Sequence, residues 1–315
     1  MMKKKITSLI MVACLLTVAV VGCGQNKQEK LPEKLTFTYV TAPLNIPSIV
    51  ERGENIFAEE FEDDGIKVEY AELTSGADQT QALASGDVQV LYGVGASSVI
   101  LSAANGADIK VLNMYSRSPK AFCLYAKDDS IQSPEDLRGK TIAGPAGTNL
   151  HELLVAFLAT ADMSIEDVNY VNMSIPDAKA ALDGGSIDVA LLAGATAYQA
   201  GQQGYHQVTD GEGLIDAIIV VAVTNEFYGK YPELIDELMD AQEEIDEFIK
   251  QNENEAFAMT AKALDLDVEA VKEMYRYYDF STKITTADKS GFQRTADFMY
   301  ENGMIEKKLN VDILF

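Results

Sequence analysis

Short hydroxyl and amide side chains stand where predicted strands end, and they are the residues of this sequence best suited to binding chemistry. Gly147, Thr148 and Asn149 follow a strand at 140–144 and precede a helix that begins near Leu150. Such a turn directs backbone N–H groups at whatever lies above the strand end, and glycine lets the backbone approach closely. Hydrogen bonding to a ligand is one interpretation, and an ordinary capped turn without a ligand is the other.

Similar residues follow five other predicted strands. If the strands are parallel, their carboxyl ends share one edge of each sheet, where open α/β sheets bind ligands. Each such group offers a hydrogen bond with a net contribution of about 0.5–1.5 kcal/mol. The predicted ligand-binding residues are Thr41, Ser75, Gly76, Ser97 and Ser98 from one part of the chain and Gly147, Thr148, Asn149, Ser174 and Thr196 from another.

The same residues give little support to catalysis or to metal binding. Ser97 and Ser98 have no evident base within reach, so hydrogen-bond donation is the role we expect of them. The two histidines, His151 and His206, have no Cys or His partner at a metal-ligand spacing. His151 is either a polar residue of the first helical turn or a ligand contact. We expect no catalytic residue, no metal and no cofactor.

Alternating strands and helices must position these turns. Strands are predicted at 35–40, 66–73 and 88–93, helices at 49–61 and 77–84, and an apolar strand at 218–224. Strands joined by helices indicate parallel pairing and hence an α/β fold. After residue 225 the chain is predicted to be helical, at 232–250, 252–263, 268–278 and 289–302.

One stretch of the sequence is echoed at a constant offset of 99 residues. The matched positions are 82–90 with 181–189, Gly95-Ala96-Ser97 with Gly194-Ala195-Thr196, Ser75 with Ser174, Asp78 with Asp177, and Gly86 with Gly185. Each Ser-x-x-Asp predicts a capped helix start and each glycine a helix end. We therefore predict an α/β fold of two similar lobes, each with a mostly parallel sheet flanked by helices, joined by two hinge crossings.

The first 23 residues have the pattern of an export signal with a lipidation site. Lys3-Lys4-Lys5 precedes an apolar run at 6–21, and Val20-Val21-Gly22-Cys23 reads as a lipobox. The apolar run is short for a span of about 20 residues, which disfavours an uncleaved anchor. We predict a signal peptide at 1–22, a lipidated tether at 23–34, lobe 1 at 35–118 and 219–315, and lobe 2 at 119–218.

The charge of the chain argues against nucleic acid as a partner. The formal net charge is −24, and removal of residues 1–22 takes away three of the 25 basic residues and none of the 49 acidic ones, which leaves −27. Phosphate backbones are held by clustered Lys and Arg, which this sequence lacks. Of the three cysteines only Cys123 would remain as a free thiol, so no disulfide is expected.

Two segments carry a resemblance to a known family: Ser133-Pro134-Glu135-Asp136-Leu137-Arg138-Gly139-Lys140 and Gly147-Thr148-Asn149-Leu150-His151. Through them the chain resembles the substrate-binding proteins of the nitrate, taurine and aliphatic-sulfonate ABC importers. That group also contains binders of thiamine precursors and riboflavin. The resemblance covers nearly the whole mature chain and extends to 74–76, 81–86, 93–98 and 180–190. It implies a type II periplasmic-binding-protein-like fold and capture of a small metabolite in an interlobe cleft. It also implies delivery to an ABC permease from a lipid anchor on the extracytoplasmic face of the cell membrane.

Two departures leave the ligand open. Sulfonate binders commonly carry a Trp-x-Pro-Tyr-like segment where this chain has Gly194-Ala195-Thr196-Ala197-Tyr198, and their strand-end acid is replaced at Ala96. The ligand is therefore a sulfonate-like anion, a zwitterion, or a neutral heteroaromatic such as a thiamine precursor or riboflavin. A ligand-sensing lipoprotein is an alternative of another class. A pyrimidine-synthase-like enzyme is a further one, although that enzyme depends on a cysteine-rich stretch that is absent here.

Replacement of Cys23 by serine tests the lipidation. Without the thiol no diacylglyceryl group can be attached, so the Cys23→Ser protein should leave the detergent phase when membranes are partitioned. Cys123→Ser is the matched control and should stay with the membrane fraction. A Cys23→Ser protein that still partitions into detergent contradicts the prediction.

Overall fold

The computed structural model describes residues 30–315 of the chain. The predicted signal peptide at 1–22, the lipidation site at Cys23 and most of the tether at 23–34 lie outside these residues. Within the described part, no helix combines the length and the apolar composition that a membrane span requires.

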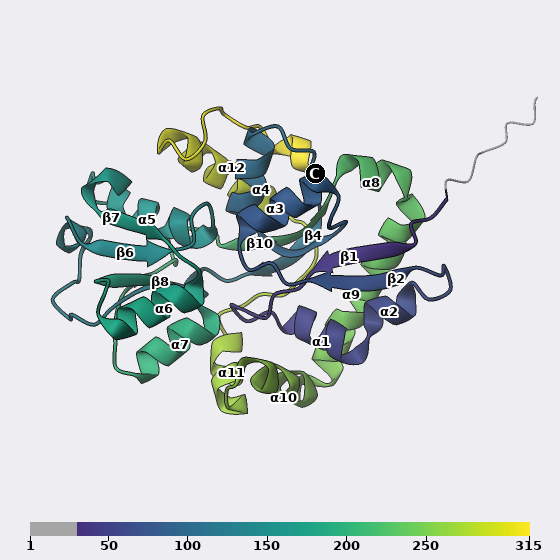
Figure 1. Cartoon of the computed structure of the whole chain (residues 1–315), viewed down its shortest axis with the longest axis horizontal. Helices are drawn as coiled ribbons and strands as arrows, with labels where there is room; N and C mark the ends of the chain where they lie inside the picture. Colours follow the sequence, from purple (N-terminus) through teal and green to yellow (C-terminus); the bar gives the residue numbers. More distant parts are fainter. Residues whose placement is uncertain (1–29) are drawn as a thin grey trace, which may run out of the picture. The chain divides into compact units, whose positions relative to one another are not determined.

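The first group of strands runs in the order β2-β1-β3-β10-β4 (Figure 1). Strand β1 (Lys34–Thr38) pairs in parallel with β2 (Lys67–Ala71). Strands β3 (Leu91–Gly95) and β4 (Lys110–Arg117) flank β10 (Ile218–Val223), which is antiparallel to both. A parallel bridge between Phe37 and Val90 joins β1 to the region just before β3. The apolar strand predicted at 218–224 is therefore the central strand of its sheet.

A second, five-stranded sheet has the same layout. Its order is β7-β6-β8-β5-β9, formed by β5 (Phe122–Ala126), β6 (Thr141–Gly144), β7 (Asn169–Asn172), β8 (Val189–Ala193) and β9 (His206–Asp210). Only β5 runs against the others. The predicted mostly parallel sheets are confirmed, with one reversed strand in each. Both reversed strands, β5 and β10, follow a short passage from the other sheet, which leaves no room for the helical crossover that a parallel strand needs.

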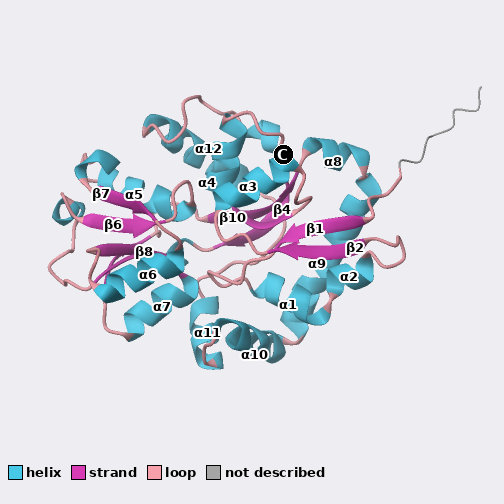
Figure 2. Ribbon diagram, in the orientation of Figure 1, coloured by secondary structure: helices cyan, strands magenta, loops and turns pink. Residues whose placement is uncertain are grey.

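Helices cover both faces of the sheets (Figure 2). Those between the strands are α1 (Ile46–Glu54), α2 (Ile56–Glu60), α3 (Gly76–Ser85), α4 (Ala96–Ala104), α5 (Asn149–Ala159), α6 (Ile175–Gly184) and α7 (Gly194–Gln202). Those after β10 are α8 (Asn225–Lys230), α9 (Pro232–Gln251), α10 (Glu253–Leu264), α11 (Val268–Tyr275) and α12 (Thr286–Glu301). The single helix predicted at 49–61 is wrong in one respect: Asn55 adopts a left-handed conformation with φ of 60° and separates α1 from α2. Asparagine tolerates that conformation better than most residues.

The structure confirms the 99-residue echo at α3 and α6. The Ser75 hydroxyl accepts a hydrogen bond from the N–H of Asp78 at 3.1 Å, and Ser174 accepts one from Asp177 at 3.3 Å. Gly86 and Gly185 close the two helices in the left-handed conformation. The next pair of helices departs from the offset of 99 by one residue, because α4 begins at Ala96 and α7 at Gly194.

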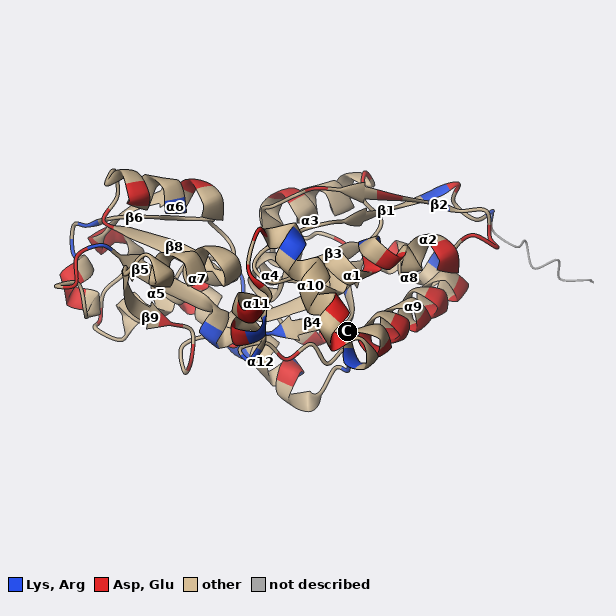
Figure 3. Ribbon diagram, turned by 90° about the horizontal axis from the view of Figure 1, so that it is seen from below, with Lys and Arg blue, Asp and Glu red and all other residues tan. Residues whose placement is uncertain are grey.

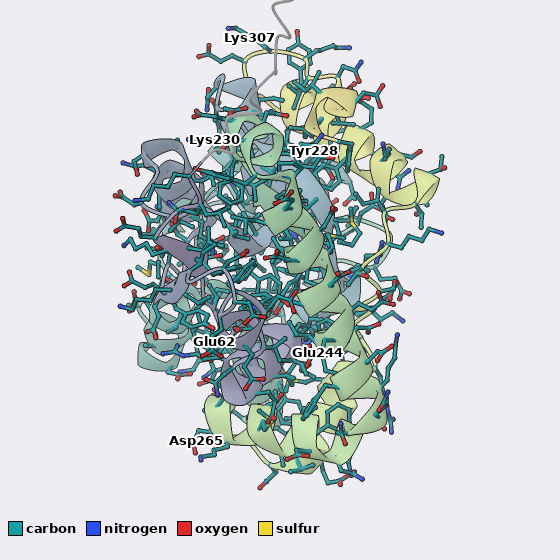
Figure 4. All side chains as sticks on the ribbon, turned by 90° about the vertical axis from the view of Figure 1, so that its right-hand side faces the viewer. Glu62, Tyr228, Lys230, Glu244, Asp265 and Lys307 are labelled. Atoms are coloured by element: carbon teal, nitrogen blue, oxygen red, sulfur yellow. The ribbon has the colours of Figure 1, made fainter. Side chains whose placement is uncertain are left out.

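Helix α9 shows how its sequence pattern positions it. Its apolar residues Leu234, Leu238 and Ile245 are each about 1% exposed in the main core, as the pattern predicts. Acidic residues occupy its outer side (Figure 3). In Figure 4 the helix runs along the face that carries Lys230 at one end and Glu244 further on. The acidic residues of α9 therefore form a solvated face.

The chain passes between the two groups of strands twice. The first passage, at 118–121, contains a short 3-10 turn at Pro119–Ala121, and the second spans 211–217. We keep the names lobe 1 and lobe 2 for the division predicted from the sequence. The residue boundaries of that division remain a proposal, which these two passages motivate.

Candidate ligand-binding site

Helices α4 and α7 begin directly after a strand, α5 follows β6 after a short turn, and none of the three has a side-chain cap. The N-cap positions of α4, α5 and α7 are Gly95, Thr148 and Ala193, and none of them accepts a hydrogen bond through its side chain. By contrast, Ser75 and Ser174 cap α3 and α6. An uncapped N-terminus offers N–H donors and a partial positive charge. The ends of β3, β6 and β8 are therefore suited to an oxygen atom or an anion.

Ser97 of lobe 1 and Asn149 of lobe 2 meet at these helix ends. The Ser97 hydroxyl lies 2.8 Å from Oδ1 of Asn149, and its single proton is shared between that oxygen and the Glu152 carboxyl. Nδ2 of Asn149 donates to the Ile218 carbonyl at 3.2 Å. Both side chains are buried, at 0% and 3% exposure. Gly95 permits this packing, because a Cβ there would lie 3.2 Å from Asn149 Oδ1. In this structure Asn149 thus joins the lobes.

Ser98, Gly76 and Gly147 form a second cluster of predicted site residues. The Ser98 hydroxyl donates to the Gly147 carbonyl at 2.9 Å. A Cβ on Gly76 would lie 2.0 Å from Ser98 Oγ, so glycine is required for this approach. Next to them, the Thr148 hydroxyl donates to the Pro145 carbonyl at 2.8 Å. Thr148 therefore stabilises the turn and leaves the N–H groups of α5 without a side-chain partner.

The remaining predicted residues make local contacts. Ser75 and Ser174 act as helix caps, the alternative that the sequence left open. The Thr196 hydroxyl donates to the Ala193 carbonyl at 2.9 Å, and the Thr41 carbonyl accepts from the Asn45 N–H at 2.9 Å. All four residues are half-buried. Their roles toward a ligand stay a prediction.

Sequence reasoning missed a backbone contact at the start of α7. The Pro43 carbonyl of lobe 1 accepts a hydrogen bond from the Ala195 N–H of lobe 2 at 3.2 Å. Gly194 has φ of +53°, and a Cβ there would lie 1.9 Å from the Pro43 carbonyl oxygen. The glycine at position 194 was the one available signal, because only glycine allows another backbone to come so near. A carbonyl oxygen thus occupies the uncapped N-terminus of α7.

Glu152 is the second residue that sequence reasoning missed. Its carboxyl group is 4% exposed and accepts hydrogen bonds from Ser97 Oγ at 2.5 Å and from Thr295 Oγ1 at 2.9 Å. Burial raises the pKa of this carboxyl to about 7, and the two hydroxyls partly oppose that shift. One side chain of α5 in lobe 2 therefore links α4 and α12 of lobe 1. Its partners are too distant in sequence for a pattern to reveal them.

His151 has a positioning role in the turn. Its Nδ1 accepts a hydrogen bond from the Gly147 N–H at 3.2 Å, and its ring stacks on Tyr170 with centroids 4.9 Å apart. Burial lowers the pKa of this imidazole, so the ring is neutral near pH 7. Among residues 30–315, no group of three or more His, Cys, Asp or Glu is arranged to hold a metal ion.

The two sheets, each with one reversed strand, and the two passages between them form a fold that solved periplasmic binding proteins share. The alkanesulfonate-binding protein SsuA from Xanthomonas axonopodis pv. citri bound to MOPS is 21% identical, with a TM-score of 0.81 over 89% of this chain and 97% of that one. The periplasmic aliphatic sulphonate binding protein SsuA from Escherichia coli is 22% identical, with a TM-score of 0.76 over 90% and 92%.

The family follows from sequence. The NMT1/THI5 like family model matches residues 60–256. The taurine-binding periplasmic protein of Escherichia coli is 32% identical over 66% of this chain and 67% of its own length. The chain belongs to the NMT1/THI5-like family, as its resemblance to the taurine and sulfonate binders predicted.

Gly194→Ala tests the contact between Pro43 and α7. The added methyl group would lie 1.9 Å from the Pro43 carbonyl oxygen, so the Ala195 N–H should lose its acceptor. We expect faster amide hydrogen exchange in peptides that cover 193–198. Gly185→Ala is the matched control, because Gly185 also has positive φ, at +71°, but has no atom within 4 Å of the added Cβ. Equal exchange in the two variants would contradict the contact.

Glu152→Gln tests the buried carboxyl through pH. Because the folded protein raises the pKa of Glu152 from 4.5 to about 7, the contact stabilises most below pH 4.5 and weakens as the pH rises through 7. Relative to the variant, the wild type should therefore lose roughly 3 kcal/mol of unfolding free energy between pH 4.5 and 8. Urea unfolding measures this difference, with Glu244→Gln as a control that removes an exposed carboxylate. A wild-type-to-variant difference that is constant with pH would refute the assignment.

Proposed function

We propose that the protein captures a small solute between its lobes and delivers it to the permease of an ABC importer. It works at the extracytoplasmic face of the cell membrane, where a lipid on Cys23 retains it. The observation that carries the proposal is the meeting of two uncapped helix ends, α4 of lobe 1 and α5 of lobe 2, through Ser97 and Asn149. The uncapped start of α7 in lobe 2 likewise meets lobe 1, at the Pro43 carbonyl. The proposal is also supported by similar proteins that are named as taurine-binding and alkanesulfonate-binding.

The solute in this proposal carries an oxyanion of the sulfonate type. Helix N-termini supply several N–H donors and partial positive charge without any basic side chain. The Pro43 carbonyl at the Ala195 N–H illustrates the kind of acceptor that fits, and a ligand oxygen would replace it there. With a net charge of −27 on the mature chain, long-range attraction of anions is weak, so short-range hydrogen bonds must supply the affinity.

No catalytic step forms part of the proposal, although the fold also occurs in the desulfurization enzyme DSZB, at 17% identity and a TM-score of 0.65. Cys123 is the one cysteine in the described residues, and it is buried. Burial raises the pKa of its thiol to about 12, which keeps it protonated. A protonated thiol is a poor nucleophile, and this favours binding over chemistry.

Alanine substitutions at Thr148 and Asn149 test the proposed site. Asn149→Ala removes the amide that joins the lobes at Ser97, so closure over a ligand should weaken. We expect calorimetric titration with taurine, methanesulfonate and MOPS to show at least a tenfold loss of affinity for the solute that binds, or about 1.4 kcal/mol. Thr148→Ala should act in the same direction by loosening the turn. Both variants lose hydrogen bonds of the ligand-free protein, so its melting temperature should fall, but by less than the loss of affinity.

Ser174→Ala is the comparison for this experiment, because Ser174 caps α6 by a hydrogen bond to Asp177. Loss of a cap costs about 1 kcal/mol of stability, so this variant should melt earlier and keep its affinity. If Thr148→Ala and Asn149→Ala instead behave like Ser174→Ala, both residues are structural and the proposed site is wrong. If the wild type binds none of the three sulfonates, the sulfonate class is wrong.

A further inference from the structure

A cavity of about 380 Å³ lies between the two lobes, with α7 and β9 on one side and the end of α11 on the other. It extends from Gly194, at the start of α7, to Lys120 and Glu212 beside the two passages. Its volume falls within the range of small-molecule sites. None of the hydroxyl or amide residues predicted to bind the ligand lines it, and it adjoins the candidate site at Gly194.

The walls of this cavity are aromatic. Tyr125, Tyr198, Tyr277 and Tyr278 line it, together with the buried Met274. The Tyr125 hydroxyl donates to Gln207 Oε1 at 3.1 Å, which fixes that ring at the base of α7. Tyrosine rings attract cations over their faces, and methionine accommodates apolar groups of varied shape. A cavity of this composition suits a ligand with an apolar body.

Carboxylates give the cavity a negative charge. Glu212 pairs with Lys120 at 3.0 Å. In the described part of the chain, neither Asp210 nor Glu273 forms an ion pair with a Lys or Arg. Desolvation, and after it the Glu273 carboxylate, raises the pKa of the Tyr198 phenol, so that phenol stays neutral. Lys120 also interacts electrostatically with Asp210, so the cavity lining holds three carboxylates, Asp210, Glu212 and Glu273, against one amine. This excess of negative charge disfavours an anionic occupant.

The Tyr278 residue lines the cavity, but its hydroxyl does not face it. The hydroxyl oxygen is buried out of reach of solvent and has no hydrogen-bond partner in the protein. Tyr278 therefore contributes apolar ring surface to the cavity wall.

We propose that this cavity binds an organic cation with an apolar or aromatic body, such as a primary amine or a quaternary ammonium. The ammonium group lies near Asp210 and Glu273, and the apolar body packs among the tyrosine rings. The site goes beyond solute capture at the helix ends, since apart from Gly194 its lining residues differ from those of that site and its charge preference is opposite. It does not depend on whether sulfonates bind.

Calorimetric titration of the mature chain tests this site with three probes. Phenethylammonium and benzyltrimethylammonium should each bind at one saturable site, and 2-phenylethanol, a neutral molecule of similar shape, should bind at least tenfold more weakly. Glu273→Gln should lower the affinity for both cations about tenfold. Glu269→Gln is the matched control, because Glu269 lies on the same helix outside the cavity and pairs with Lys272 at 2.8 Å. Its affinity for the cations should match the wild type.

Two substitutions of Tyr198 distinguish the contribution of its ring from that of its hydroxyl group. Tyr198→Leu should weaken binding of the quaternary ammonium, whereas Tyr198→Phe should retain that binding, since the face of the ring attracts the cation. Thermal melting checks that each variant is folded, and Glu273 is exposed, so its replacement by glutamine should leave the fold intact. The inference is overturned if neither cation binds the wild type saturably. It is also overturned if the alcohol binds equally well, or if Glu273→Gln and Glu269→Gln bind the cations alike.

Discussion

The carboxyl group of Glu152 is the interaction on which the junction of the lobes depends. It takes hydrogen bonds from Ser97 on α4 and Thr295 on α12, so a single side chain of α5 fixes three helices. A buried carboxylate without a positive partner is costly, and the raised pKa of about 7 keeps the protonated form within reach near neutrality. The bond between Ser97 and Asn149 lies beside it, so the position of Asn149 follows from the same contact.

Apart from the Glu152 carboxyl, the junction is built from neutral groups, and this limits its strength. Hydroxyls, an amide and backbone carbonyls meet at Asn149, at Ser98 and at Pro43. Each such bond contributes about 0.5–1.5 kcal/mol net, so the contacts hold the lobes together without locking them. A ligand that replaces one or two of these bonds can then shift the balance between lobe arrangements, since its differential affinity need only match a few kcal/mol.

Local signals in the sequence predicted much of the fold, and contacts between distant residues account for what they missed. Ser75 with Gly86, and Ser174 with Gly185, mark helices whose ends are determined within one turn, so the echo was readable. The reversed direction of β5 and β10 could not be predicted from the sequence, because it follows from the short passages between the sheets. Likewise, Glu152 looked like one more polar residue of α5, since Ser97 and Thr295 lie 55 and 143 residues away.

The central position of β10 has a consequence for the order in which the protein can form. Strands β3 and β4 share β10 as their neighbour, and β10 ends at Val223, whereas every strand of the second sheet lies between Phe122 and Asp210. A chain that emerges from its N-terminus can therefore complete the second sheet first. Until β10 follows, β3 and β4 present unpaired N–H and C=O groups, the kind of edge that pairs with other chains. Strands β3 and β4 are thus made before the second sheet but are protected from aggregation after it.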